Sequence, residues 1–331
     1  MRKIHRKEPS NSCDLSYLSK NVTNSLKGIL SVCIVMHHVA LDTELFGRIG
    51  KILMNPVGSF SVAIFFFLSG YGLLSSYYQK GMIYIDRFPR NRILPFYLIC
   101  VLLTFISIVI NEITQYEELS TKLVIWSLTF GKNTIIRKGW YLQVALLSYL
   151  CFYLIFHSVR NNKCRLVLAL VVEIAFVGYC ILNDYPETYY KSTPAILVGG
   201  LWCVYRKELD AFLTIRKMIL VMTLFVALCF ASVLVGGISA ICLKLVLAIL
   251  VGPMALFCIK KISINNLVTR WLGTYSFEIY ICHGIVMNVA RGASWYIVSD
   301  CCFLIMTVVG TGILSVLLKP LTQKIYTLIR I

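Results

Sequence analysis

The stretch "LKGILSVCIVMHHVAL", from Leu26 to Leu41, predicts a helix that crosses a membrane, yet it carries two adjacent histidines. The chain around it has 331 residues, of which 58% are hydrophobic and 14% are charged, and its mean hydropathy is +0.78. These charged side chains are too few to cover a soluble domain of this length. The composition therefore predicts an all-α, polytopic membrane domain, and the two imidazole rings inside it need an explanation.

Apolar runs long enough to span a bilayer, which takes roughly 20 residues, recur along the whole chain. We expect a membrane bundle of about ten spanning helices, at 26–45, 57–78, 93–111, 140–157, 165–182, 193–206, 218–236, 239–259, 274–291 and 300–318. The sixth run is short and contains Gly199 and Gly200, so it is tilted, broken or tightly packed. The run 121–130 is too short to span and predicts a re-entrant or interfacial segment.

The charge of the chain predicts its orientation. There are 32 Lys and Arg against 15 Asp and Glu, a net charge of +17. With the N-terminus in the cytoplasm, about 23 basic residues fall in cytoplasmic segments and about 8 outside, which is the usual bias of membrane proteins. We therefore expect a cytoplasmic N-terminal segment (1–25), a transmembrane domain (26–318) and a cytoplasmic tail (319–331), with both termini in the cytoplasm.

Two kinds of partner are not indicated by the sequence. No basic stripe with interleaved aromatic residues lies outside the apolar runs, so we expect no nucleic-acid partner. The 13 cysteines are scattered, and none has the spacing to another Cys or His that zinc sites use, so we expect no metal.

The two histidines are the first candidates for chemistry. His38 lies about 16 Å along the helix from Lys27, near mid-bilayer, where an ionisable group costs several kcal/mol unless it is paired or faces water. His37 points roughly 100° away from His38, so at most one of them faces a given site. Asp42 follows His38 by four residues, and on that face a carboxylate would orient a general base. The alternative is a satisfied buried histidine, with Asp42 merely at the helix end.

Polar and aromatic residues also gather before two other spans. Arg87, Arg90 and Arg92, in "RFPRNRILPFYL", precede the third span on the cytoplasmic side, and planar guanidinium groups suit a phosphate or a lipid headgroup. The alternative is ordinary positive-inside charge. Trp140 and Tyr141 open the fourth span, where interfacial aromatic residues are common.

The ninth span holds a further polar pair. Glu278 and His283, in "YSFEIYICHGIVMN", share a helix face only loosely and either contact a substrate or hold helices together. Glu173 and Lys244 are additional charges inside apolar runs. They pair with each other or with Glu278, and the sequence leaves this choice open.

These pieces, in this order, resemble the acyltransferase-3 family of integral membrane acyltransferases, whose best-known branch modifies bacterial surface glycans. The resemblance covers about residues 20–320. It rests on Lys27 and His38 with ten residues between them, "FFFLSGYGLL" in the second span, "RNRILPFY" before the third, "WYL" opening the fourth and "SFEIYICHG" in the ninth. The family pattern of an arginine, ten residues and a histidine selects His38 over His37. Lys27 stands where the family has arginine, so a bidentate contact is lost there.

The second family signature, Arg-x-x-Arg, can be aligned in two ways. Arg87 and Arg90 have the literal spacing. Alignment on the following Ile-x-Pro instead selects Arg92 and places Pro89 at the first arginine. The sequence leaves both alignments open.

Two further departures concern the acceptor more than the reaction. Gly139 stands where many relatives carry a histidine, and Ala145 stands where some carry a glutamate. The resemblance implies a membrane O-acyltransferase that moves acetyl from cytoplasmic acetyl-CoA to a sugar hydroxyl of a cell-surface polysaccharide or lipid-linked glycan. It implies a multi-pass location in the bacterial inner or plasma membrane, with 26–318 as the transmembrane acyltransferase domain.

The resemblance also implies roles for the candidate residues. His38 would be the general base, and Asp42 would orient it. The donor site would hold Lys27, Arg87, Arg90 and Arg92, and the acceptor site would hold His37, Trp140, Tyr141, Glu278 and His283. The expected partners are the glycan acceptor and membrane lipids.

Two other classes compete with this hypothesis. A transporter or flippase also suits ten spans with buried charges, but residues 26–160 and 165–318 lack the similarity that transporter halves often show. A non-catalytic membrane scaffold predicts that His38→Ala leaves acceptor modification intact.

Overall fold

The computed structural model describes residues 16–330, which are almost entirely helical. In chain order the elements are η1 (Ser16–Leu18), α1 (Lys20–Asp42), α2 (Gly47–Lys80), α3 (Met82–Asp86), η2 (Pro89–Ile93), α4 (Leu94–Thr114), α5 (Thr121–Leu128), α6 (Trp140–Ser158), α7 (Asn162–Leu182), η3 (Glu187–Tyr189), α8 (Ala195–Val204), α9 (Arg206–Phe212), α10 (Ile215–Leu234), α11 (Gly237–Lys261), α12 (Leu267–Ala290) and α13 (Asp300–Arg330). The all-α prediction is confirmed. Residues 1–15 of the expected N-terminal segment lie outside the described residues.

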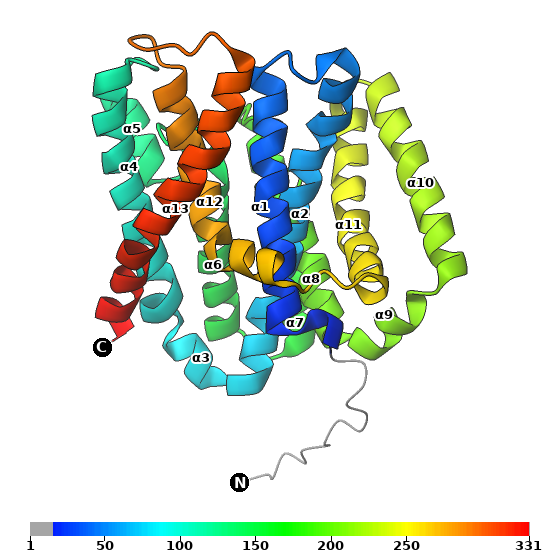
Figure 1. Cartoon of the computed structure of the whole chain (residues 1–331). Coiled ribbons are helices and arrows are strands. Elements are labelled where there is room, and N and C mark those ends of the chain that lie inside the picture. Colours follow the sequence, from blue (N-terminus) through cyan, green and yellow to red (C-terminus); the bar gives the residue numbers. More distant parts are fainter. Residues whose placement is uncertain (1–15, 331) are drawn as a thin grey trace.

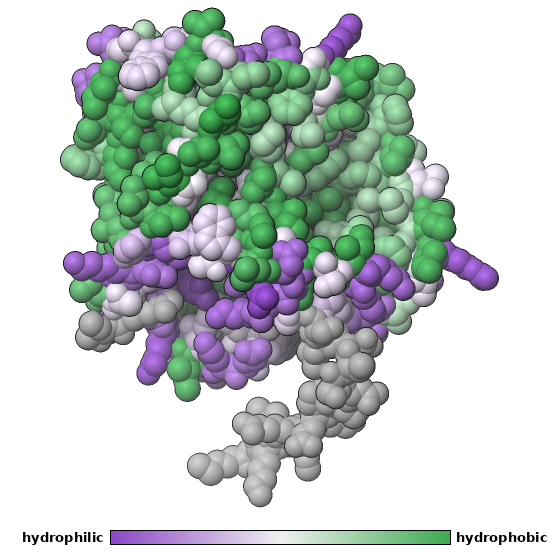
Figure 2. Space-filling model, in the orientation of Figure 1, coloured by the Kyte–Doolittle hydropathy of each residue, from purple (hydrophilic) through white to green (hydrophobic). Residues whose placement is uncertain are grey.

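The helices form one bundle, in which α1 begins and α13 ends at the same end, the lower one in Figure 1. A broad hydrophobic band crosses the visible face of the bundle, and hydrophilic residues gather above and below it (Figure 2). Eight helices of the described chain are long and apolar enough to cross a membrane: α1, α2, α4 with η2, α6, α7, α10, α11 and α13. The chain is a multi-pass membrane protein.

Eight of the ten expected spans correspond to these eight helices, and the sixth and the ninth do not. The sixth is α8, a helix of 10 residues that packs tightly on α2. A Cβ on Gly199 would come within 1.9 Å of the Phe67 carbonyl oxygen, so only glycine allows this approach. The ninth is α12, which has 24 residues and is buried over most of its length. Because α12 packs against α1, α4 and α13, it is not exposed to lipid as the outer helices are, and it carries Glu278 and His283.

Two expected peripheral segments are helical. The short run expected at 121–130 forms α5, a helix of 8 residues. The residues expected as a tail from Lys319 onward continue α13 through Arg330, with Pro320 inside the helix. The last membrane helix is therefore longer than the apolar run 300–318 predicts.

Two glycines bring α1 and α12 into direct backbone contact. A Cβ on Gly28 would lie 2.4 Å from the Gly273 nitrogen, and a Cβ on Gly273 would lie 2.2 Å from the Asn24 carbonyl oxygen. Small residues at such positions allow helices in a membrane to approach closely. The contact holds α1 beside α12, so that His38 and His283 face each other further along the two helices.

Candidate active site

A polar cavity of about 650 Å³ lies at the end of the bundle where α1 finishes. Helices α1 and α2, the loop before α6 and the loop after α7 enclose it. Its polar and aromatic lining includes His37, His38, Asn55, Ser59, Asn111, Tyr116, Glu117, Lys132, Asn133, Arg137, Lys138, Trp140, Lys191, Tyr280 and Asn288. We call this space the outer cavity. It brings both predicted histidines and Trp140 together.

His38 lies on the wall of the outer cavity and is half-buried. Its ring stacks on His283, with centroids 5.2 Å apart and planes 12° apart, and lies 4.7 Å from the His37 ring. Its Nδ1 is enclosed and has no hydrogen bond to any described residue. A buried polar atom without a partner costs about 1–3 kcal/mol, and no described residue offers Nδ1 a hydrogen bond that would offset this cost.

His37 and His283 are fixed by backbone contacts. Nδ1 of His37 donates to the Met54 carbonyl oxygen at 2.8 Å, which leaves Nε2 as the acceptor of a neutral ring. Nδ1 of His283 lies 2.5 Å from the Tyr280 carbonyl oxygen. His283 is fully buried and does not line the outer cavity, so it supports His38 from behind.

Asp42 does not make the expected hydrogen bond to His38. Its carboxylate instead accepts a hydrogen bond from Arg137 at 2.8 Å. Arg137 also donates to the Asn288 side chain at 3.2 Å and lies 4.4 Å from the centre of the Tyr116 ring. The physical reason is that a guanidinium forms a stronger pair with a carboxylate than a neutral imidazole does. Asp42 therefore holds the loop before α6 in place.

Arg137 is a site residue that the sequence hypothesis missed. A signal was present, because Arg137 and Lys138 are adjacent basic residues in a loop on the side where few basic residues are expected. Burial lowers the pKa of the Lys138 amine below its ordinary value; Asp42 opposes this shift and Arg137 adds to it.

A second cavity, of about 170 Å³, lies on the other side of three side chains. We call it the inner cavity. Its polar lining consists of Lys27, Ser69, Tyr141, Tyr149, Ser276 and Tyr280. Ile34, Val62 and Tyr280 line both cavities and form the septum between them. Ile34 follows Lys27 by seven residues and precedes His38 by four, so the three side chains lie on one face of α1. This face of α1 runs along both cavities.

The three arginines before α4 have different surroundings. Arg92, from the π-helical turn η2, is close enough to Lys27, Tyr84 and Tyr149 to interact with them electrostatically. Arg90 donates through Nε to the Ile329 carbonyl oxygen at 2.7 Å and so ties η2 to α13. Arg87 is exposed. Of the two alignments that the sequence leaves open, the one that selects Arg92 brings an arginine to the Lys27 end of the inner cavity.

The aromatic pair that opens α6 is divided between the cavities. Trp140 lines the outer cavity, and its ring lies 5.9 Å from the Tyr189 ring. Tyr141 lines the inner cavity and lies 5.2 Å from the Tyr280 ring of the septum. The two residues were expected to share one substrate site, whereas the helix turns them toward different spaces.

Glu278 lines neither cavity. Its carboxylate, which is 1% exposed, accepts hydrogen bonds from Lys319 at 3.0 Å and from Thr322 at 2.7 Å. The structure thus pairs Glu278 with a lysine from α13 and places it away from both cavities, while its predicted contact with the acceptor stays a prediction. Its place is that of a polar contact between helices.

The two other intramembrane charges do not form the pairs that the sequence suggested. Glu173 accepts a hydrogen bond from Thr193 at 2.5 Å, and Lys244 pairs with Glu187 at 2.5 Å. Each charge thus finds a partner in the loop after α7 or just before α8.

A sequence model described as an acyltransferase domain, that of acyltransferase 3, matches residues 23–318. The chain belongs to the acyltransferase-3 family. It is a membrane acyltransferase, and both cavities lie within the matched residues. No curated protein and no solved structure matches the chain.

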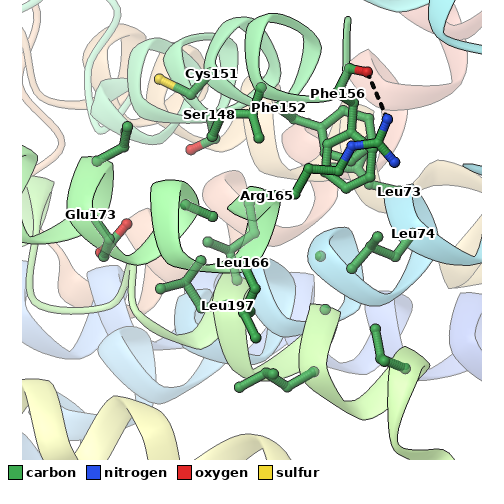
Figure 3. Close-up of a pocket in the computed structure, with 18 of the residues that line it drawn as sticks. Leu73, Leu74, Ser148, Cys151, Phe152, Phe156, Arg165, Leu166, Glu173 and Leu197 are labelled. Carbon is green, nitrogen blue, oxygen red and sulfur yellow. Dashed lines mark hydrogen bonds between the residues drawn. The ribbon is translucent and has the colours of Figure 1, made fainter. Parts of the chain in front are cut away.

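This acyltransferase contains a third cavity, of about 360 Å³, between α2, α6, α7 and α8 (Figure 3). Its wall is mostly apolar, with Arg165 at one end and Glu173 further along. The guanidinium of Arg165 donates to the Phe156 and Val159 carbonyl oxygens and to the Tyr77 hydroxyl. Arg165 thus holds the start of α7, and the third cavity offers fewer polar side chains than the outer cavity does.

Proposed function

We propose that this acyltransferase moves an acetyl group from cytoplasmic acetyl-CoA to a sugar hydroxyl of a cell-surface polysaccharide or lipid-linked glycan, with His38 as the general base. The observation that carries the proposal is the place of His38. It lies on the wall of a large polar cavity, one helical turn from the septum, and the inner cavity continues behind the septum to Lys27.

The inner cavity has the features of a donor site. Lys27 lines its far end, and the exposed Arg92, which does not line the cavity, is close enough to Lys27 to act on it electrostatically; this positive charge suits the phosphates of coenzyme A. The bias of Lys and Arg along the chain supports a cytoplasmic location for this end. Its volume of about 170 Å³ favours a short acyl group over a long one.

The outer cavity has the features of an acceptor site. It is wider, it is lined by amide, hydroxyl and charged groups, and it lies at the opposite end from Arg92. Trp140 offers an indole ring at its wall. Such a lining supplies hydrogen bonds to the hydroxyl groups of a sugar.

The chemistry follows from these positions. His38 takes the proton of an acceptor hydroxyl, and the hydroxyl oxygen forms a bond to the thioester carbonyl carbon presented across the septum. The carbon–sulfur bond then breaks, and the sulfur leaves with the proton that His38 returns. The products are an O-acetyl ester and free coenzyme A. His37 and His283 hold the His38 ring in position.

Transfer of radiolabelled acetyl from acetyl-CoA to endogenous glycan in isolated membranes tests this function. The His38→Gln variant should transfer at least about 100-fold more slowly than wild type, because a general base contributes 10²–10⁴-fold. His157→Gln is the matched control, since His157 is an exposed histidine at the end of α6 and lines neither cavity. Equal transfer by wild type and His38→Gln, at equal protein levels, would remove His38 from the reaction.

A further inference from the structure

The outer cavity carries far more positive than negative charge. Lys132, Arg137, Lys138 and Lys191 line it, whereas Glu117 is its one acidic lining residue in the described chain. The Glu117 carboxylate already accepts a hydrogen bond from the Asn133 side chain at 3.0 Å. A sugar site that needed only neutral hydrogen bonds would have no use for this charge.

None of the three ammonium groups that line the outer cavity forms an ion pair in the described structure, and the Lys132 ammonium lies over the Tyr185 ring, 5.9 Å from its centre. Lys138 and Lys191 are half-buried, and their side chains form no hydrogen bond or ion pair with any residue from 16 to 330. The nearest carboxylates are taken by other cations, since Arg137 pairs with Asp42 at 2.8 Å and Lys244 pairs with Glu187. The two ammonium groups are therefore available to bind an anionic group that enters the cavity.

The backbone around both lysines is held firmly. The Tyr280 hydroxyl donates to the Lys138 carbonyl oxygen at 2.8 Å, and Lys138 has a φ of 61°, which is rare for a side chain with a Cβ. Beside Lys191, the Ser192 hydroxyl donates to the Ser59 carbonyl oxygen of α2 at 3.1 Å. The charges of both lysines act on His37. The two lysines thus line the same cavity as His37 and His38, from two separate loops.

This arrangement costs free energy while the cavity holds only water. Partial burial removes hydration from each ammonium group, and like charges on one cavity repel. Both costs are relieved when an anion enters between them, and such complementarity selects one ligand over its neutral counterpart.

We propose that the acceptor is an acidic glycan, whose anionic group, a carboxylate or a phosphate, is bound by Lys138 and Lys191 while its hydroxyl faces His38. The role of the hydroxyl rests on the proposed acyl transfer. The anion site itself needs no turnover, so the two can be tested separately.

Thermal stabilisation of the purified full-length protein in detergent tests the anion site. D-glucuronate and inorganic phosphate are the probes, D-glucose is the neutral comparison, and the ionic strength is held constant. At least one anionic probe should raise the unfolding temperature more than glucose does. This effect should vanish in Lys138→Gln/Lys191→Gln and persist in Lys122→Gln, an exposed lysine on α5 outside the cavity. Equal stabilisation of wild type and the double variant, or none by either anion, overturns the proposal.

The labelled product identifies the source of the charge. After depolymerisation, the His38-dependent labelled fragment should bind an anion exchanger. Amidation of carboxylates should release it if the charge is a sugar acid, and phosphatase should release it if the charge is a phosphate. A neutral fragment would overturn the proposal. If wild-type membranes transfer no label, the proposed acyl transfer is contradicted. The thermal measurement still decides whether the anion site exists.

Kinetics separate anion binding from a merely structural role of the lysines. Lys138→Gln/Lys191→Gln should raise the KM for the acceptor about tenfold or more, as expected for the loss of charge-assisted hydrogen bonds, and leave the KM for acetyl-CoA unchanged. Lys138→Arg/Lys191→Arg should restore most of the affinity, because the charge is kept. Equal increases in both KM values would contradict an acceptor-specific site.

Discussion

Gly58 shows how closely single residues fix the position of the histidines. It lies on α2 directly against His37, and a Cβ added there would come within 2.4 Å of the imidazole Cδ2. Because His37 is held by the Met54 carbonyl on one side and packs on His38 on the other, the ring has little freedom to move away. One methyl group added at position 58 would therefore displace the His37 ring, which contacts His38.

We expect Gly58→Ala to lower the free energy of unfolding by about 1–3 kcal/mol and to slow acetyl transfer, because overpacking displaces the His37 ring or α2. Thermal unfolding in detergent and membrane transfer assays measure the two effects. Gly72→Ala is the control on the same helix, since its added Cβ meets nothing within 4 Å. Identical behaviour of the two variants would show that the contact at Gly58 is soft.

We expect binding at the proposed acceptor site to depend on pH through Lys138 and Lys191. Burial lowers the pKa of Lys138, and burial likewise lowers the pKa of Lys191, so both ammonium groups lose their proton at a lower pH than free lysine does. For an acidic acceptor, the KM should therefore rise with increasing pH through this lowered range. In Lys138→Arg/Lys191→Arg the rise should move to higher pH, because guanidinium stays charged. KM measured against pH in both proteins tests this, and superimposable profiles would exclude the two lysines as the titrating groups.

At the scale of helices, the septum separates the two cavities, and Ala145 controls the space on one side of it. Ala145 is 4% exposed on α6 and lines only the inner cavity. A larger side chain there fills the space proposed for the acetyl group without touching the outer cavity. A substitution on α6 can therefore alter the inner cavity, the proposed donor site, without altering the outer cavity, the proposed acceptor site.

We expect Ala145→Phe to reduce acetyl transfer at least about tenfold, since overpacking the inner cavity shifts the thioester by more than transfer tolerates. Thermal stabilisation by an anionic sugar should be unchanged, because the outer cavity keeps its lining. Ala175→Phe, which faces outward from α7, controls for the added bulk. Full activity of Ala145→Phe would place the donor elsewhere.

Much of the arrangement of helices could be predicted from the sequence, and the side-chain partners could not. Apolar run length predicts where spans lie, because the bilayer fixes it. The pairing of charged side chains is different. Arg137 lies 95 residues after Asp42 in the sequence, and Lys319 lies 41 residues after Glu278, so no local sequence pattern contains both members of either pair. The choice of His38 followed from the family spacing, and its place beside a cavity agrees with it.

At the scale of the whole molecule, the orientation in the membrane can be tested with native cysteines. Cys164 begins α7 at the end of the bundle that carries Arg92, and Cys301 lies in the first turn of α13 at the opposite end; both are exposed. If the basic end is cytoplasmic, a membrane-impermeant maleimide added to intact cells should label a variant that retains only Cys301. A variant that retains only Cys164 should react only after the cells are permeabilised. The reverse pattern would place Lys27 and Arg92 outside the cell.

The septum has a consequence for the energy supply of the cell. An enzyme that takes one substrate from each side of a coupling membrane must have nearly opposed openings, and an uninterrupted aqueous path between them would let protons flow down the electrical gradient, each releasing about 2.3 kcal/mol per 100 mV. Ile34 and Val62 place aliphatic side chains where the two water-accessible spaces come closest. If acetyl transfer takes place across this septum as proposed, the same three side chains would also insulate the membrane against ion leakage.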